Sequence, residues 1–149
     1  MRRLAFAAVA LAAALALGGC GPAAGGDPEM DAAAIQSELV QIDGVTDASV
    51  GTYNTGAPGR HALRTKLVVD EAGLADLPGV LDAAIDIVAA EAPGWSEYEF
   101  SVSAVDESSP TGTVSLSLDK RLTPDDVPYG TLGSSLTMTP DELRQAAGS

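Results

Sequence analysis

The sequence predicts an α+β fold, a two-layer α/β sandwich in which two helices cover one face of a four-stranded antiparallel sheet. Three observations predict it. Apolar residues recur first at helical spacing and then at alternate positions, in the order αββαββ, and a short C-terminal helix follows. Each expected strand is apolar on one face only, which is typical of a sheet with one face open to water. The length of 149 residues suits one domain.

Residues 1–19 are expected to be a signal peptide. Met1-Arg2-Arg3 is a basic start, and an uninterrupted apolar run extends from Leu4 to Leu17. The run is shorter than the roughly 20 apolar residues that a membrane-spanning helix needs. It suits the apolar region of a secretory signal, with positive charge before it.

The apolar run ends in Leu17-Gly18-Gly19-Cys20. This tetrapeptide resembles the lipobox of bacterial lipoprotein precursors, in which an aliphatic residue and two small residues precede the cysteine that is modified. The resemblance implies cleavage between Gly19 and Cys20 and attachment of acyl chains such as palmitate at Cys20. It also implies that the mature protein is anchored to the outer, extracytoplasmic face of the cell membrane. An ordinary secretory signal that contains a cysteine by chance is the alternative.

Residues 20–26 are expected to be the lipidated cysteine and a flexible tether. The segment after Cys20 reads Gly-Pro-Ala-Ala-Gly-Gly, which has no side chain able to enter a core and keeps the backbone mobile. An α+β domain is expected over 27–120. Residues 121–149 are expected to be an irregular C-terminal segment that contains a short helix.

The domain is expected to begin with a helix that ends near Asp43-Gly44. Asp27-Pro28-Glu29 combines a capping Asp, Pro at the first helical position and an acid in the first turn. One apolar stripe then recurs at spacings of four and three: Ile35, Leu39 and Ile42.

Residues 45–54 and 62–70 are expected to form two strands joined by the Gly- and Pro-containing loop 55–59. The first alternates weakly. The second alternates well, and its two faces carry different side chains: Leu63, Thr65, Leu67 and Val69 against Arg64, Lys66 and Asp70.

A second helix is expected from Asp76 to Pro93-Gly94, and two further strands follow it at 97–104 and 113–119, around the loop 106–112. The helix has an apolar stripe: Leu77, Val80, Leu81, Ala84, Ile85 and Val88. The strands carry their apolar residues on one face: Tyr98, Phe100, Val102 and Ala104, then Val114, Leu116 and Leu118.

The expected topology follows from the handedness of connections. A right-handed crossover would place the third strand parallel to the second and leave a gap between them for the fourth. The second and fourth strands would then be central. This arrangement resembles a circular permutation of the ferredoxin-like fold, which hosts many functions and therefore implies none.

The C-terminal segment contains two Thr-Pro-acid starts, Thr123-Pro124-Asp125-Asp126 and Thr139-Pro140-Asp141-Glu142. The second is a capping box, and it predicts a short helix from Thr139 to Ala147. Residues 126–135 have no period and are expected to lie irregularly on the domain. Three of the segment's side chains are candidate contacts: Val127, Tyr129 and Leu132.

Charge and motif content exclude several functions. The chain has 8 Lys and Arg against 21 Asp and Glu, a net charge of −13, which excludes nucleic acid and anionic headgroups as electrostatic partners. One Cys excludes an internal disulfide, and one His leaves no zinc cluster. Phosphate-loop, nucleophile-elbow and zinc-protease motifs are absent. We therefore expect no enzymatic activity, cofactor or metal, and His61 is expected to lie exposed in a loop without a functional role.

Carboxylates are the one abundant functional group. Three adjacent pairs lie in expected loops, and calcium binds oxygen ligands of this kind: Asp70-Glu71, Asp106-Glu107 and Asp125-Asp126. None of the pairs continues as an EF-hand loop. Acidic loops that keep the domain soluble are the favoured interpretation, and a calcium site is the alternative.

The outer face of the sheet is a second candidate surface. It is expected to be polar and nearly flat, without an aromatic platform, and able to dock a partner or a glycan: Glu97, Glu99, Ser101, Ser103, Thr113, Ser115 and Ser117. Trp95 is expected to cover an edge of the core.

Together these features predict a monomeric, lipid-anchored lipoprotein that acts as a binding module toward a protein or another component of the cell envelope. A small-ligand or cation-binding module, for sensing or buffering, is the alternative. An enzyme with carboxylate chemistry comes third, because no second functional group accompanies the acids.

Overall fold

The computed structural model describes residues 28–148, and their mixed architecture confirms the α+β class. The helices are α1 (Ala32–Leu39), α2 (Glu71–Ala75), α3 (Leu77–Glu91) and α4 (Pro140–Ala146), with a 3₁₀ turn η1 (Leu118–Lys120). The strands are β1 (Val45–Asn54), β2 (His61–Val69), β3 (Glu97–Val105), β4 (Thr113–Ser115), β5 (Thr131–Leu132) and β6 (Leu136–Met138). The expected signal peptide and tether, with Gly19 and Cys20, lie outside the described residues.

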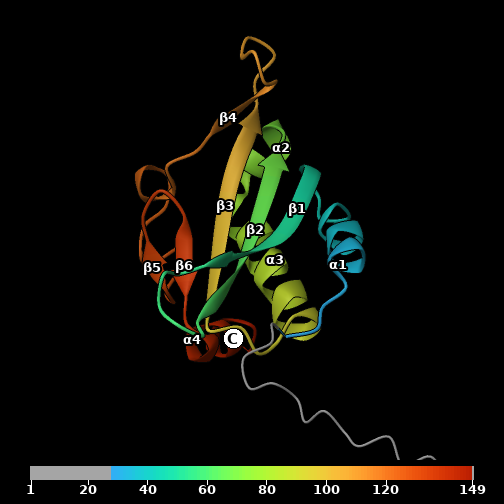
Figure 1. Ribbon diagram of the computed structural model, residues 1–149. Helices are drawn as coiled ribbons and strands as arrows, with labels where there is room; N and C mark the ends of the chain where they lie inside the picture. The colour runs from blue at the N-terminus through green and yellow to red at the C-terminus, as the bar shows by residue number, and fades with distance from the viewer. Residues whose placement is uncertain (1–27, 149) are drawn as a thin grey trace, which may run out of the picture.

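The sheet has six strands in the order β1-β2-β3-β6-β5, and β4 pairs with β3 beside this path (Figure 1). Its one parallel pairing is β2 with β3, which are in register from Ala62–Glu97 to Val69–Ala104. The expected four-stranded antiparallel sheet was therefore wrong. Direct pairing of β2 and β3 leaves no gap for β4, so the likeness to a permuted ferredoxin-like fold does not hold.

The edge of β3 that does not pair with β2 is shared between two short strands, β4 and β6. β4 pairs only with Ser103–Val105, at one end of β3, and the chain then turns through η1. β6 occupies the other end and pairs with Tyr98–Phe100. The expectation of an irregular segment over 126–135 was wrong in this respect, because β5 and β6 extend the same sheet.

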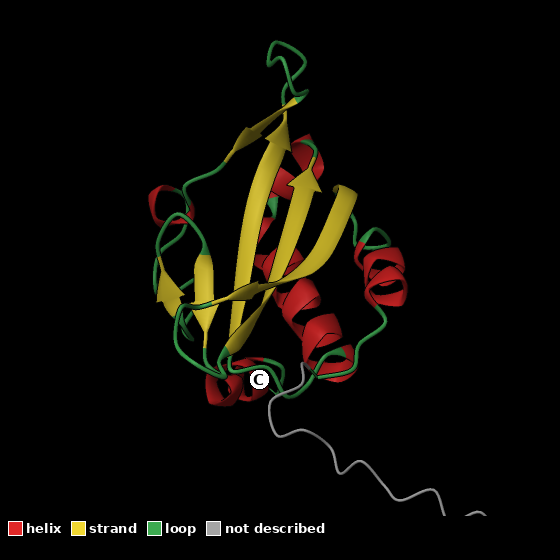
Figure 2. Ribbon diagram, in the orientation of Figure 1, coloured by secondary structure: helices red, strands yellow, loops and turns green. Residues whose placement is uncertain are grey.

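The helices cover one side of the sheet. Figure 2 shows α3 running behind β2 and β3, with α1 beside β1. Side chains along β3 alternate between buried and half-exposed, as the sequence predicts. The apolar stripe of α3 is buried against them, which confirms its predicted face. The core therefore lies on the helix side, and the opposite side of β1, β2 and β3 is open.

The first helix starts later than the sequence indicates. Asp31, not Asp27, caps α1, and its Oδ1 accepts hydrogen bonds from Ala33 N at 3.1 Å and Ala34 N at 3.0 Å. The chain leaves α1 through Gly44, at φ 82°, whose carbonyl accepts from Asp70 N at 3.0 Å. A Cβ at Gly44 would lie 2.2 Å from the backbone nitrogen of Gly73, so only glycine permits this approach.

The C-terminal helix is confirmed with its cap. Thr139 N donates to Glu142 Oε2 at 2.8 Å, and Glu142 N donates to Thr139 Oγ1 at 3.3 Å. The expected contacts are also confirmed: Val127 is buried, and Tyr129 and Leu132 pack half-buried against the core. No helix among residues 28–148 is long and apolar enough to span a bilayer.

Candidate functional site

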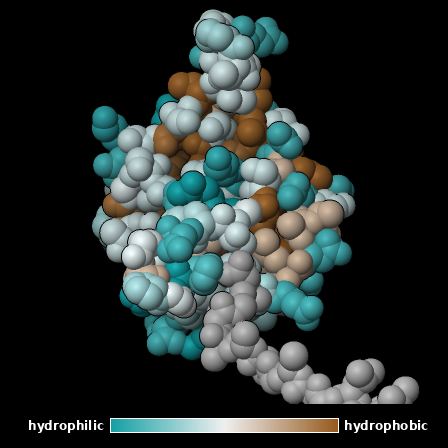
Figure 3. Space-filling model, in the orientation of Figure 1, coloured by the Kyte–Doolittle hydropathy of each residue, from teal (hydrophilic) through white to brown (hydrophobic). Residues whose placement is uncertain are grey.

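Strand register determines which residues share the open face of the sheet. In the pairing of β2 with β3, Arg64 lies opposite Glu99 and Lys66 opposite Ser101. Across the other edge of β2, Arg64 lies opposite Gly51 and Lys66 opposite Ser49. Figure 3 views this side of the molecule, and hydrophilic residues gather across its middle. The open face is defined here by Ser49, Gly51, Tyr53, Arg64, Lys66, Glu97, Glu99, Ser101 and Ser103.

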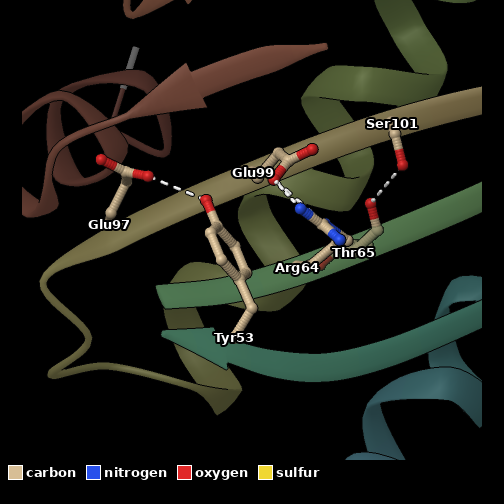
Figure 4. Close-up of polar contacts among 6 residues, drawn as sticks. All are labelled: Tyr53, Arg64, Thr65, Glu97, Glu99 and Ser101. Atoms are coloured by element: carbon tan, nitrogen blue, oxygen red, sulfur yellow. Dashed lines mark hydrogen bonds and ion pairs between the residues drawn. The ribbon is translucent and has the colours of Figure 1, made fainter. Parts of the chain in front are cut away.

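Three side-chain contacts tie the strands together on this face, one of them from Ser101 Oγ to Thr65 O at 3.5 Å (Figure 4). Tyr53 Oη donates to Glu97 Oε1 at 2.8 Å, and Arg64 donates through Nε and Nη2 to Glu99 Oε2 at 3.0 and 2.8 Å. Tyr53 and Glu97 belong to strands that are not neighbours. Both lie opposite Ala62 of β2, whose small side chain lets the phenol pass over it.

The contacts raise the pKa of two groups in this cluster. Burial raises the pKa of Tyr53 well above its ordinary value, and the Glu97 hydrogen bond and the Glu99 charge raise it further. The hydrogen bond to Glu99 raises the pKa of Arg64. Tyr53 therefore stays neutral and Arg64 stays charged. The Arg64 side chain is 38% exposed and the Glu99 side chain only 16%, so the cation is the more solvent-exposed partner of this ion pair.

A shallow hollow of about 220 Å³ lies along β1 on the open face, and we call it the β1–β2 hollow. Gly51 forms part of its lining, and a Cβ at that position would meet no atom within 4 Å. Two basic residues and no acidic residue line it: Ser49, Val50, Gly51, Thr52, Tyr53, Arg64 and Lys66.

A second hollow of about 310 Å³ adjoins the first, and we call it the serine hollow. Its serines come from β3, β4 and the turn between β5 and β6, and Lys66 lines both hollows. The lining is Lys66, Glu99, Ser101, Val102, Ser103, Ser115, Leu116, Ser134 and Ser135. The structure thus brings much of the predicted polar face together around one lysine.

Each predicted carboxylate pair has one member that bonds to its own turn. Asp70 caps α2, with Oδ1 accepting from Ala72 N at 2.9 Å and Gly73 N at 3.1 Å. Asp106 accepts from Ser108, and Asp126 accepts from Thr123.

The hydrogen bond from the Ser108 hydroxyl is the largest cause that lowers the pKa of Asp106. For Asp126, the largest cause that lowers the pKa is the hydrogen bond from the Thr123 backbone amide. Within residues 28–148, no group of three or more His, Cys, Asp or Glu is placed to hold a metal ion.

His61 is half-buried and begins β2, so its expected place in an exposed loop was wrong. Its carbonyl accepts from Ser96 N at 3.2 Å and Ser96 Oγ at 2.7 Å, which fixes the entry to β3. It lies outside both hollows on the open face.

Trp95 is 2% exposed and belongs to the core, in agreement with its expected place. Its backbone N–H donates to Tyr98 Oη at 3.2 Å, and that hydroxyl donates to Ala92 O at 3.0 Å. The indole Nε1 has no hydrogen-bond partner within the described part of the chain. A third hollow, of about 220 Å³, lies beside it against α4.

Sequence reasoning did not find three parts of this site. Gly51 and Tyr53 lie on the weakly alternating strand, and the turn serines Ser134 and Ser135 lie in the segment expected to be irregular. The face does carry an aromatic ring, contrary to expectation. That ring is covered by Arg64, whose Cζ lies 4.3 Å from the Tyr53 ring centroid.

Comparisons with protein families, with curated proteins and with solved structures gave no match to this chain.

Proposed function

We propose that this chain is a lipoprotein, held at the outer face of the cell membrane by acylation of Cys20, whose folded part is a non-catalytic binding module. The observation that carries the anchor is the position of the single cysteine, directly after Leu17-Gly18-Gly19 at the end of the apolar run. Two or more acyl chains hold a soluble domain stably at a membrane, whereas one binds only marginally.

The place of Pro28 would set how an anchored domain lies at the membrane. Pro28 lies beside Gly94, which lines a hollow together with Pro140 and Leu143 of α4. The eight peptide links from Cys20 to Pro28 span at most about 30 Å. An anchored Cys20 would keep the α4 end close to the bilayer, and the open face would remain accessible from the side.

The binding role is supported by the open face. Its two adjoining hollows expose hydroxyl, guanidinium and ammonium groups, while Tyr53 and Arg64 are held by Glu97 and Glu99. Small-ligand sites are concave and use a small number of placed polar groups to orient the ligand. This favours, as a second candidate, the small-ligand form of the binding module over a cation-binding one.

Replacement of the cysteine tests the anchor. Wild-type protein should fractionate with membranes and enter the detergent phase, and Cys20→Ala should be released or left unprocessed. Gly21→Ala is the matched control, because it changes the neighbouring residue and keeps the thiol. Processing of Cys20→Ala at the same bond, with continued membrane association, would contradict the proposal.

A further inference from the structure

We propose that the β1–β2 hollow and the serine hollow form one site for an anionic ligand that also bears hydroxyl groups. The anionic group would lie over Gly51 beside Lys66 and Arg64, and the hydroxyls would extend over the serines. This inference deepens the proposed function, since it rests on the open face being the binding surface. It does not depend on the anchor at Cys20.

The β1–β2 hollow carries positive charge on a strongly acidic chain. The chain has 21 acidic residues against 8 Lys and Arg, yet this hollow is lined by two basic residues and no acidic one. Lys66 is exposed and makes no ion pair with any residue in 28–148. Arg64 is paired, but Glu99 beneath it is the more buried partner. An incoming carboxylate or phosphate would therefore meet two cations.

Gly51 leaves room for a ligand in the β1–β2 hollow. Gly51 lies inside a ten-residue strand, and its φ is not positive, so its backbone does not require glycine. Glycine in a strand interior weakens the strand, and it often marks a place where a ligand approaches the backbone closely. Because no atom lies within 4 Å of the missing Cβ, the space above Gly51 is open to solvent.

The serine hollow supplies the hydroxyl partners. Its five serines come from three separate segments, and a hydroxyl can both donate and accept hydrogen bonds. Glu99 also lines this hollow and can accept from a ligand hydroxyl, while its charge disfavours a second anionic group there. The β1–β2 hollow therefore favours an anionic group and the serine hollow favours hydroxyl groups, and Lys66 lines both hollows.

A carboxylate and a phosphate would both bind the cations of Lys66 and Arg64. The ligand is therefore either an acidic sugar, which carries a carboxylate, or a polyol phosphate. The acidic surface of the rest of the domain repels both. At about 0.15 M ionic strength the Debye length is about 8 Å, which screens distant carboxylates more than the two cations in contact with the ligand. Binding should therefore be measured at that ionic strength.

The test is calorimetric titration of the full-length protein, purified in detergent, with glucuronate and with glycerol 1-phosphate. Glucose, glycerol and inorganic phosphate are the matched probes, because each lacks either the charge or the hydroxyls. We expect one of the two anionic polyols to bind at least tenfold more tightly than each matched probe. Selective binding of glucuronate would identify the carboxylate source, and selective binding of glycerol 1-phosphate the polyol phosphate.

Three variants locate the site. Lys66→Gln should weaken binding at least tenfold, whereas Lys120→Gln, an exposed lysine outside both hollows, should bind as wild type. Gly51→Val should abolish binding by filling the hollow, yet keep or raise the thermal unfolding midpoint, because valine favours strands. Equal affinity for the neutral probes or for inorganic phosphate, no binding of either anionic polyol, or wild-type affinity in Lys66→Gln and Gly51→Val would overturn the inference. None of these results bears on the Cys20→Ala fractionation.

Discussion

The guanidinium of Arg64 lies over the ring of Tyr53, with 4.3 Å between the Arg64 Cζ atom and the ring centroid. A stack of this kind contributes about 0.5–1 kcal/mol at an exposed site. Here it also aligns two hydrogen bonds that end on neighbouring positions of one face of β3, at Glu97 and Glu99. The stack thereby links β1, β2 and β3 and gives the β1–β2 hollow a fixed wall.

This environment predicts an unusual titration. Burial, with the carboxylates of Glu97 and Glu99, raises the pKa of Tyr53 above the ordinary value of about 10. Subtracting the tyrosinate absorbance of Tyr53→Phe from that of the wild type isolates this residue. We expect it to ionise above its ordinary pKa, and Glu97→Gln to lower that pKa. Ionisation of Tyr53 at or below pH 10 would show that the cluster does not form.

The same shift predicts a loss of stability in alkali. Above about pH 10 the unfolded Tyr53 releases its proton while the folded one keeps it, so the folded state binds more protons and the free energy of unfolding falls as pH rises. Tyr53→Phe should remove this part of the pH dependence. Denaturant unfolding across that pH range measures the difference, and identical slopes in both proteins would contradict it.

Two adjacent residues of β3 test the one-sided sheet. Phe100 is fully buried, whereas Ser101 lies half-exposed on the open face. Phe100→Ala should lower the free energy of unfolding by about 3–5 kcal/mol. Ser101→Ala should change it by about 0.5 kcal/mol or less. Denaturant unfolding of the full-length protein measures both, and similar costs would mean that both faces of the sheet are covered.

Net charge predicts how salts act on stability. With 21 acids against 8 Lys and Arg, carboxylates repel one another, and this repulsion weakens as the Debye length falls from about 10 Å at 0.1 M salt to about 3 Å at 1 M. The melting temperature should rise smoothly with sodium chloride. Calcium at matched ionic strength should act alike. A saturating effect of calcium alone would support a cation site, with Asp106 and Asp126 the first residues to replace.

Local patterns predicted much of the fold. The alternation of β3, the apolar stripe of α3 and the capping box at Thr139 each depend on nearby residues, and the structure confirms all three. Strand partnership depends on distant residues instead. The pattern of Val114, Leu116 and Leu118 suggests a full strand, but Val114 is 46% exposed and Leu118 is buried in the η1 turn. Pairing between β2 and β3 therefore could not be inferred from periodicity.

The candidate site shows the same division. Alternation places Arg64 and Lys66 on the polar face of β2, as the sequence predicts. Their meeting with Gly51 and Glu99 requires the register of two different pairings, one of them the parallel pairing that the sequence did not reveal. The turn serines reach the site only because β6 pairs with β3.

The central claim is that Cys20 becomes an acylated N-terminus, and mass spectrometry of the mature N-terminal peptide tests it most directly. We expect a peptide that begins at Cys20 and carries the added mass of a diacylglyceryl thioether. Digestion of this peptide with a lipase should release the ester-linked acyl chains as fatty acids and leave an S-glyceryl cysteine as the first residue. A mature N-terminus at another residue, or an unmodified Cys20, would contradict the account.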